Sequence, residues 1–168
     1  MRLLVVSDSH GSVRNLREVL WRQEALPVSQ RPEILLHLGD GVRDPERVQL
    51  PDGMTFFAVR GNCDGALASD HPVVRMVSFG GFRILMMHGH TFGVKSSLVS
   101  AVAHARQEGA HLLLYGHTHE PFAKTIEAGT LFGDTPLHVF NPGSLAEGCF
   151  GLVELSGKGI FTSHGSLR

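Results

Sequence analysis

The segment Gly116-His117-Thr118-His119 places two histidines two positions apart, directly after the apolar run Leu112–Tyr115. A short apolar run that ends at a glycine is typical of a buried strand. In an extended or turning backbone, side chains two positions apart point the same way, so both imidazoles can face one point. Imidazole is the commonest metal ligand, although a polar loop with two hydrated histidines gives the same pattern. The segment therefore indicates either a metal site or a solvent-exposed loop.

Four other apolar runs also end at carboxylate, amide or imidazole side chains. These runs, with the polar residues that follow them, are Leu3–Val6 with Asp8 and His10, Ile34–Leu38 with Asp40, Phe56–Val59 with Asn62, Cys63 and Asp64, and Ile84–Met87 with His88 and His90. Ligands of open α/β sheets bind outside one shared edge of the strands. The recurrence of one pattern along the chain favours a shared site over unrelated polar loops.

Composition narrows the classes of function. The chain has 168 residues and a formal net charge of -1, from 15 basic and 16 acidic side chains. This balance does not support a general nucleic-acid or membrane-surface role. No apolar run approaches the ~20 residues of a membrane span, and the N-terminal run is shorter than the core of a signal peptide. With two cysteines and no paired framework, we expect a cytoplasmic protein with one domain over residues 1–168.

The order of the expected elements predicts an α/β fold. A helix is expected from Ser12, as N-cap, to about Leu26, and a short helix is expected to begin at Asp44-Pro45. The alternation of strand, helix and strand predicts a parallel, helix-covered sheet in the first half. The remaining expected elements are a hairpin of 73–79 and 82–87, a helix over 97–108, and strands at 112–115, 122–126, 137–140, 151–155 and 159–162. The second half is expected to build an additional sheet, and His37, within a strand, is expected to be structural.

Together, the candidate ligands comprise two carboxylates, an amide and four imidazoles: Asp8, His10, Asp40, Asn62, His88, His117 and His119. They are too many for one four-coordinate structural zinc, and none is a cysteine. The number fits two ions that share a carboxylate, an arrangement that clamps both reacting oxygens in phosphoryl transfer. Mixed oxygen and nitrogen ligands suit manganese, iron, cobalt, nickel or zinc better than calcium.

In their order along the chain, these blocks resemble the calcineurin-like metallophosphoesterases, and above all their small single-domain bacterial and archaeal phosphodiesterases. The resemblance covers essentially the whole chain, including Asn141-Pro142-Gly143-Ser144 near its end. It implies a four-layer α/β/β/α sandwich, with two mixed sheets flanked by helices and the metals at the strand ends. It also implies two divalent cations, with Mn2+ expected foremost and Ni2+, Fe2+, Co2+ or Zn2+ as alternatives.

The resemblance assigns each ligand a place. Asp40 would bridge both ions, and a hydroxide between them would attack phosphorus, while Asn62 would also touch a phosphate oxygen. The first ion would be held by Asp8, His10 and His119, and the second by Asn62, His88 and His117.

Position 63 departs from the pattern of many relatives, which carry a histidine there that is thought to protonate the leaving group. Cys63 is a poorer acid near neutral pH, with an ordinary thiol pKa of about 8.5. We therefore expect activated aryl phosphodiesters to be the best substrates. Asp64 would orient Cys63 or His90, or cap a turn. His90 would serve as a substitute acid or contact the phosphate, unless it is an ordinary loop histidine.

The sequence thus predicts a metal-dependent phosphodiesterase that acts on a small phosphodiester. One alternative is a non-catalytic scaffold, because a eukaryotic retromer subunit of similar fold works through protein contacts with a degraded site. A second alternative is a phosphomonoesterase or nucleotide phosphatase. The full set of ligands favours the enzyme, and the sequence leaves a homo-oligomer open.

Overall fold

The computed structural model describes residues 1–129 and 133–168. Within these residues the helices are α1 (Val13–Glu24) and α2 (Val99–Gln107), with 3-10 turns η1 (Val28–Gln30), η2 (Asp44–Arg47), η3 (Ala66–Ala68) and η4 (His90–Phe92). The strands are β1 (Arg2–Val6), β2 (Ile34–His37), β3 (Thr55–Ala58), β4 (Val74–Phe79), β5 (Phe82–Met87), β6 (Leu112–Tyr115), β7 (Phe122–Ile126), β8 (Leu137–Asn141), β9 (Cys149–Ser156) and β10 (Gly159–Ser166). No helix in these two ranges has the length and apolar character needed to cross a membrane.

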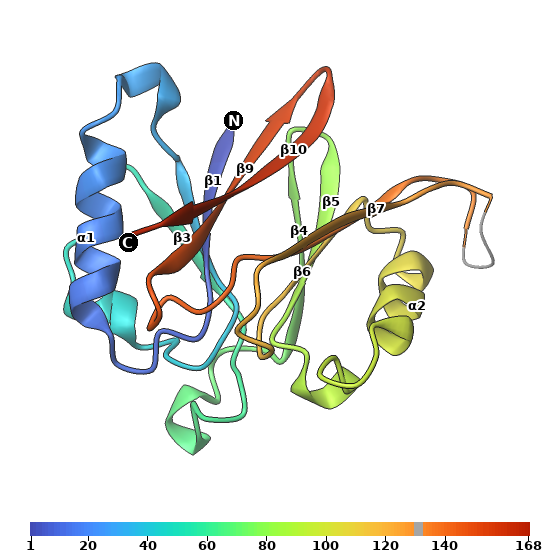
Figure 1. Ribbon diagram of the computed structural model, residues 1–168, viewed down its shortest axis with the longest axis horizontal. Coiled ribbons are helices and arrows are strands. Elements are labelled where there is room, and N and C mark those ends of the chain that lie inside the picture. Colours follow the sequence, from blue (N-terminus) through green and yellow to red (C-terminus); the bar gives the residue numbers. More distant parts are fainter. Residues whose placement is uncertain (130–132) are drawn as a thin grey trace.

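The strands form two five-stranded sheets that pack face to face (Figure 1). The first has the order β10-β9-β1-β2-β3, with β1, β2 and β3 parallel. The second has the order β4-β5-β6-β8-β7, with β5, β6 and β8 parallel. Helix α1 covers the outer face of the first sheet, and α2 covers the outer face of the second. The predicted four-layer α/β/β/α sandwich with two mixed sheets is confirmed.

Strand β1 shows why the central strands are continuously apolar. Leu3 and Val5 belong to the core between the two sheets, whereas Leu4 and Val6 pack with Leu16 of α1 on the other face. Successive strand residues point to opposite faces, so a strand covered on both sides needs apolar residues throughout. All five of these side chains are fully buried. Because the buried core holds β1 in place, it also fixes the position where the polar loop after this strand begins.

The last hairpin differs from the sequence-based expectation. Strands β9 and β10 do not join the second sheet; β9 pairs antiparallel with β1 in the first sheet, with Arg2 opposite Glu154. The expectation that the whole second half builds an additional sheet is therefore wrong for this hairpin. The edge of β1 away from β2 offers open backbone groups, and Val153 and Leu155 of β9 join the core between the sheets. An ion pair between Arg2 and Glu154, at 3.0 Å, crosses the same pair of strands.

The two expected helix caps have different outcomes. Ser12 is the N-cap residue of α1, as expected, but its side chain makes no capping hydrogen bond. Arg43, not Asp44, is the N-cap of η2. The Asp44 carboxylate instead accepts hydrogen bonds from the Ser9 hydroxyl at 2.6 Å and the Gly11 N–H at 2.8 Å. Asp44 therefore ties its own loop to the loop that follows β1.

Candidate metal centre

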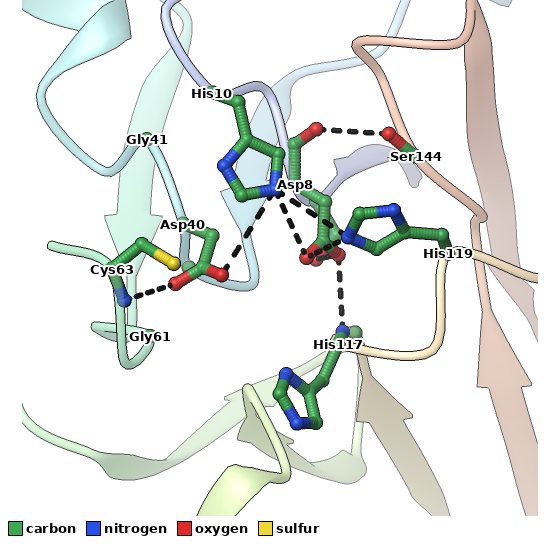
Figure 2. Close-up of polar contacts among 12 residues, drawn as sticks. Asp8, His10, Asp40, Gly41, Gly61, Cys63, His117, His119 and Ser144 are labelled. Atoms are coloured by element: carbon green, nitrogen blue, oxygen red, sulfur yellow. Dashed lines mark hydrogen bonds and ion pairs between the residues drawn. The ribbon is translucent and has the colours of Figure 1, made fainter. Parts of the chain in front are cut away.

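The candidate ligands lie in loops at the C-terminal ends of strands from both sheets, along the lower edge in Figure 1. The structure gathers six of the seven into two groups, in each of which the ligand atoms lie within 4.8 Å of one another: Asp8 with His10 and His119, and Asp40 with His88 and His117. Figure 2 shows the imidazoles of His10 and His119 directed at the Asp8 carboxylate. Asn62, the seventh, lies in the loop after β3, where its exposed side chain donates to the Cys63 sulfur at 3.3 Å.

The backbone is unusual at the ligand positions. The non-glycine residues with positive φ in the described part of the chain are Asp8 (52°), His10 (45°), Asp40 (55°), His117 (69°) and His119 (64°), and each is a candidate ligand. Residues other than glycine rarely adopt this left-handed conformation, which costs about 1–3 kcal/mol each and persists mainly at functional sites. The fold therefore maintains local strain where these side chains converge.

Asp8 gives the clearest indication that the donor atoms suit a cation. One carboxylate oxygen, Oδ2, accepts hydrogen bonds from the Ser7 hydroxyl at 2.5 Å and the His117 N–H at 3.0 Å. The other, Oδ1, is buried without a hydrogen-bond partner and lies 3.2 Å from His119 Nε2 and 3.9 Å from His10 Nε2. A buried, unpartnered carboxylate oxygen is costly. A divalent cation would satisfy this oxygen and the facing imidazoles together, so the donor set fits a metal ion.

His88 is oriented as a metal ligand in the second group. Its Nδ1 lies 2.8 Å from the Leu38 carbonyl oxygen, which only accepts, so Nδ1 carries the hydrogen. Its Nε2 faces Asp40 Oδ2 at 3.3 Å and His117 Nδ1 at 3.1 Å: the protonated imidazole donates to Asp40, and the neutral imidazole offers the Nε2 lone pair to a metal ion. Metal-binding histidines commonly use their other nitrogen in this way. Because His88 Nε2 is also 4.0 Å from Asp8 Oδ1, the two groups adjoin.

Asp40 lies where the two groups meet. Its Oδ1 accepts the Cys63 N–H at 2.8 Å, and its Oδ2 is 4.0 Å from His10 Nε2 (Figure 2). Burial alone would raise the pKa of Asp40, but hydrogen bonds from His88 and the Cys63 N–H hold that pKa well below its usual range. The carboxylate is therefore ionised at neutral pH, as a bridging ligand must be.

Comparison with known proteins agrees with this geometry. Residues 1–158 match the family model of the calcineurin-like phosphoesterase superfamily domain. The chain belongs to this family. The resemblance inferred from the sequence is confirmed, and the protein is a metallophosphoesterase by family.

Individual relatives support the same assignment. This calcineurin-like phosphoesterase is 28% identical to YsnB of Bacillus subtilis, a probable metallophosphoesterase, over 145 residues that cover 86% of this chain and 75% of the relative. It is 30% identical to the phosphodiesterase YfcE of Escherichia coli K12 over 166 residues, covering 87% and 80%. The crystal structure of a predicted phosphoesterase from Streptococcus pneumoniae shares the fold, with a TM-score of 0.72, 24% identity, and coverage of 98% and 88%.

Asp64 holds the loop that carries Asp40. Its carboxylate accepts four backbone N–H bonds, from Asp40 at 2.8 Å, Gly41 at 2.6 Å, Val42 at 2.9 Å and Gly61 at 2.6 Å. Burial would raise the pKa of Asp64, but these donors outweigh it and lower the pKa. Of the roles considered for Asp64, the contacts match the cap of a turn, and it makes no hydrogen bond to the Cys63 or His90 side chains among the described residues. Asp64 is thus a positioning residue for Asp40.

Cys63 and His90 lie beside the two groups. A hydrogen bond to the Asp40 carboxylate, more than burial, raises the pKa of the exposed Cys63 thiol. The Cys63 sulfur also lies within 4.8 Å of donor atoms of His10 and Asp40, a third potential ligand group that the sequence did not indicate. The His90 ring centroid is 5.5 Å from that of His88, and burial lowers the pKa of His90. Both side chains therefore lie beside the candidate ligands.

A buried hydrogen-bond chain behind the ligands was missed by the sequence reasoning. The Gly39 N–H donates to His37 Nδ1 at 3.1 Å, so His37 Nε2 carries the hydrogen and donates to the Ser9 hydroxyl at 3.0 Å. Ser9 in turn donates to Asp44 at 2.6 Å. The chain connects the loop of Asp8 and His10 to the loop of Asp40. The expectation that His37 is structural agrees with its full burial.

His37 is expected to make the metal-free protein sensitive to mild acid. Burial lowers the pKa of His37 from 6.5 to about 4. As the pH falls, His37 of the unfolded chain therefore binds a proton near pH 6.5, whereas His37 of the folded chain binds it only near pH 4. The stability that His37 contributes is complete above pH 6.5 and decreases by about 3 kcal/mol as the pH falls to about 4.

Urea denaturation of the metal-free protein at several pH values measures this loss. The matched variant is His37→Gln, whose amide still donates to Ser9 but does not titrate. We expect the free energy of unfolding of the variant to fall less steeply than that of the wild type between pH 6.5 and 4. Equal slopes would show that His37 is not a buried neutral imidazole.

Proposed function

We propose that the protein is a metal-dependent phosphodiesterase that binds two divalent cations, with manganese as the first choice. Asp8, His10 and His119 would hold one ion, and Asn62, His88 and His117 the other, with Asp40 shared between them. The observation that carries the proposal is the adjoining pair of carboxylate–imidazole groups, in which a buried Asp8 oxygen has no hydrogen-bond partner. Mixed oxygen and nitrogen donors favour Mn2+, Fe2+, Co2+, Ni2+ or Zn2+.

Two bound ions would supply an acidified water as nucleophile and would neutralise charge on the phosphoryl oxygens. The protein's own residues set the orientation of the substrate. The side chains of His10 and His119 are partly exposed, so phosphate can reach the site from this side. Asn62 is exposed at the same loop edge as Cys63 and can donate its amide hydrogens to a phosphate oxygen. These residues define the open face of the centre.

Cys63 influences which esters would react well. Its raised pKa keeps the thiol protonated at neutral pH and makes it a weak proton donor to a departing oxygen. Substrates with leaving groups that depart without a proton, such as aryl esters, are therefore favoured. The similarity to a protein named as a phosphodiesterase supports diesters over monoesters. Both cysteines are free, in keeping with the reducing cytoplasm predicted from the sequence.

Manganese is expected to activate hydrolysis of bis(p-nitrophenyl) phosphate, because the donor groups are complete only with a cation between them. Release of p-nitrophenolate is followed with each divalent ion in turn, and elemental analysis determines the metal content. We expect the aryl diester to react at least about tenfold faster than an alkyl phosphomonoester, given the weak proton donor at position 63.

Chelation by EDTA serves as the control and should remove the activity, which should return when manganese is restored. Faster turnover of an alkyl phosphomonoester would contradict the diesterase and favour a phosphomonoesterase. A protein that binds manganese tightly but hydrolyses neither class of ester would instead support the non-catalytic scaffold.

A further inference from the structure

A cavity of about 490 Å³ opens beside the proposed metal centre, between the segment that follows η4 and the segment that joins β6 to β7. Thr118, in one wall, lies between the candidate ligands His117 and His119. Lys95 also lines the cavity. Thr118 therefore places the cavity next to the loop that carries these two candidate ligands.

Both walls of the cavity are held by hydrogen bonds. On one side, the carbonyl oxygen of Gly93 accepts the N–H groups of Ser96 and Ser97, at 2.9 and 3.1 Å. On the other side, the Thr118 hydroxyl accepts the side-chain amide of Asn141 at 3.0 Å and the Glu120 N–H at 3.3 Å. The cavity therefore has preformed walls, which reduces the cost of ordering them around a ligand.

The inner surface combines an aromatic wall with one cation, Lys95, and one exposed carboxylate, Glu120. Tyr115 and Phe122 form an edge-to-face pair with centroids 6.3 Å apart, and Phe122 is only half-buried. Leu98 adds apolar surface on the opposite side. Lys95 is exposed and has no hydrogen bond or ion pair within residues 1–129 and 133–168. An aromatic face accepts a second ring well, and an unpaired ammonium attracts phosphate.

We propose that this cavity is the subsite for one ester group of the substrate, and that this group carries a planar ring of aryl or nucleoside size. The ring packs against Phe122, while Lys95 pairs with the charge of the phosphoryl group at the mouth of the cavity. The volume suits one ring system with its attached sugar or substituent. This inference deepens the proposed function and rests on it, because the phosphoryl group must bind at the metal centre.

Isothermal titration of the manganese-loaded protein with phenylphosphonate and methylphosphonate tests the subsite. Both probes carry the same head group, and neither contains an ester bond that can be hydrolysed. We expect the wild type to bind phenylphosphonate about tenfold more tightly, because only this probe buries a ring. In Phe122→Ala the preference should fall to about twofold, whereas Phe161→Ala, which removes an exposed ring on β10, should retain it.

Lys95→Met should weaken both phosphonates equally, by about fivefold, and Lys124→Met, on the exposed part of β7, should weaken neither. Equal affinity of the wild type for the two probes, a preference that survives Phe122→Ala, or no binding of either probe would overturn the subsite. Ring preference in a protein that hydrolyses no diester would support the subsite and contradict the catalytic proposal. Diester hydrolysis without ring preference would contradict the subsite alone.

Discussion

Replacing Asp40 by asparagine is expected to abolish hydrolysis of bis(p-nitrophenyl) phosphate, with kcat/KM reduced at least about a thousandfold. Asn has the same size as Asp, so the N–H bond from Cys63 can be retained. The change removes the negative charge between the two donor groups and can turn an amide N–H toward His88 Nε2, which lies 3.3 Å from Asp40 Oδ2. Because Asp40 is proposed to be shared by both ions, the variant should bind manganese much more weakly.

Isothermal titration with manganese and release of p-nitrophenolate measure the two effects of Asp40→Asn. The matched control is Asp52→Asn, which neutralises an exposed carboxylate in the turn before β3 and outside the metal centre. The control should keep the affinity and rate of the wild type. An Asp40→Asn protein with wild-type manganese affinity and rate would show that this carboxylate does not bridge ions.

The sequence predicted the central strands because they are buried on both faces, whereas the four layers were implied by the family resemblance. Runs such as Leu3–Val6 and Leu112–Tyr115 are apolar at every position, so a short window of sequence is enough to recognise them. The return of β9 to β1 was not predictable in this way. The pairing of Leu3 with Val153 depends on which strand edge remains open after the other strands have assembled. The local spacing of apolar residues carries no information about that edge.

The sequence identified the candidate ligands, but it did not identify the residues whose hydrogen bonds hold those ligands in position. Asp8, Asp40 and His117 follow recognisable strands, so their convergence could be inferred from strand ends alone. The bonds that position them join residues far apart in the chain, such as Ser9 to Asp44 and Asp64 to the Asp40 loop. The sequence around Asp44-Pro45 even favoured a different role, as a helix cap, because a local motif carries no information about a partner in another loop.

Gly61→Ala is expected to disrupt the same centre by steric overlap alone. A Cβ atom at position 61 would lie 2.1 Å from Asp40 Oδ1 and 2.7 Å from the Asp40 backbone nitrogen. Neither atom can move freely, because Asp40 Oδ1 accepts the Cys63 N–H, and the N–H groups of Asp40 and Gly61 both donate to Asp64. The methyl group must therefore displace the carboxylate and its loop. We expect a loss of about 3 kcal/mol in unfolding free energy and at least about a tenfold loss of manganese affinity.

Gly157→Ala provides the matched control, because a Cβ atom there would meet no other atom within 4 Å and its backbone φ is not positive. Urea denaturation of the metal-free proteins should place the control within about 0.5 kcal/mol of the wild type. Manganese titration then separates a displaced Asp40 from a general loss of folding. If the variant is still folded at the assay temperature, weaker manganese binding is due to the changed position of Asp40. If Gly61→Ala bound manganese as tightly as Gly157→Ala, the Asp40 carboxylate could shift without loss, and the proposal that both ions share it would be wrong.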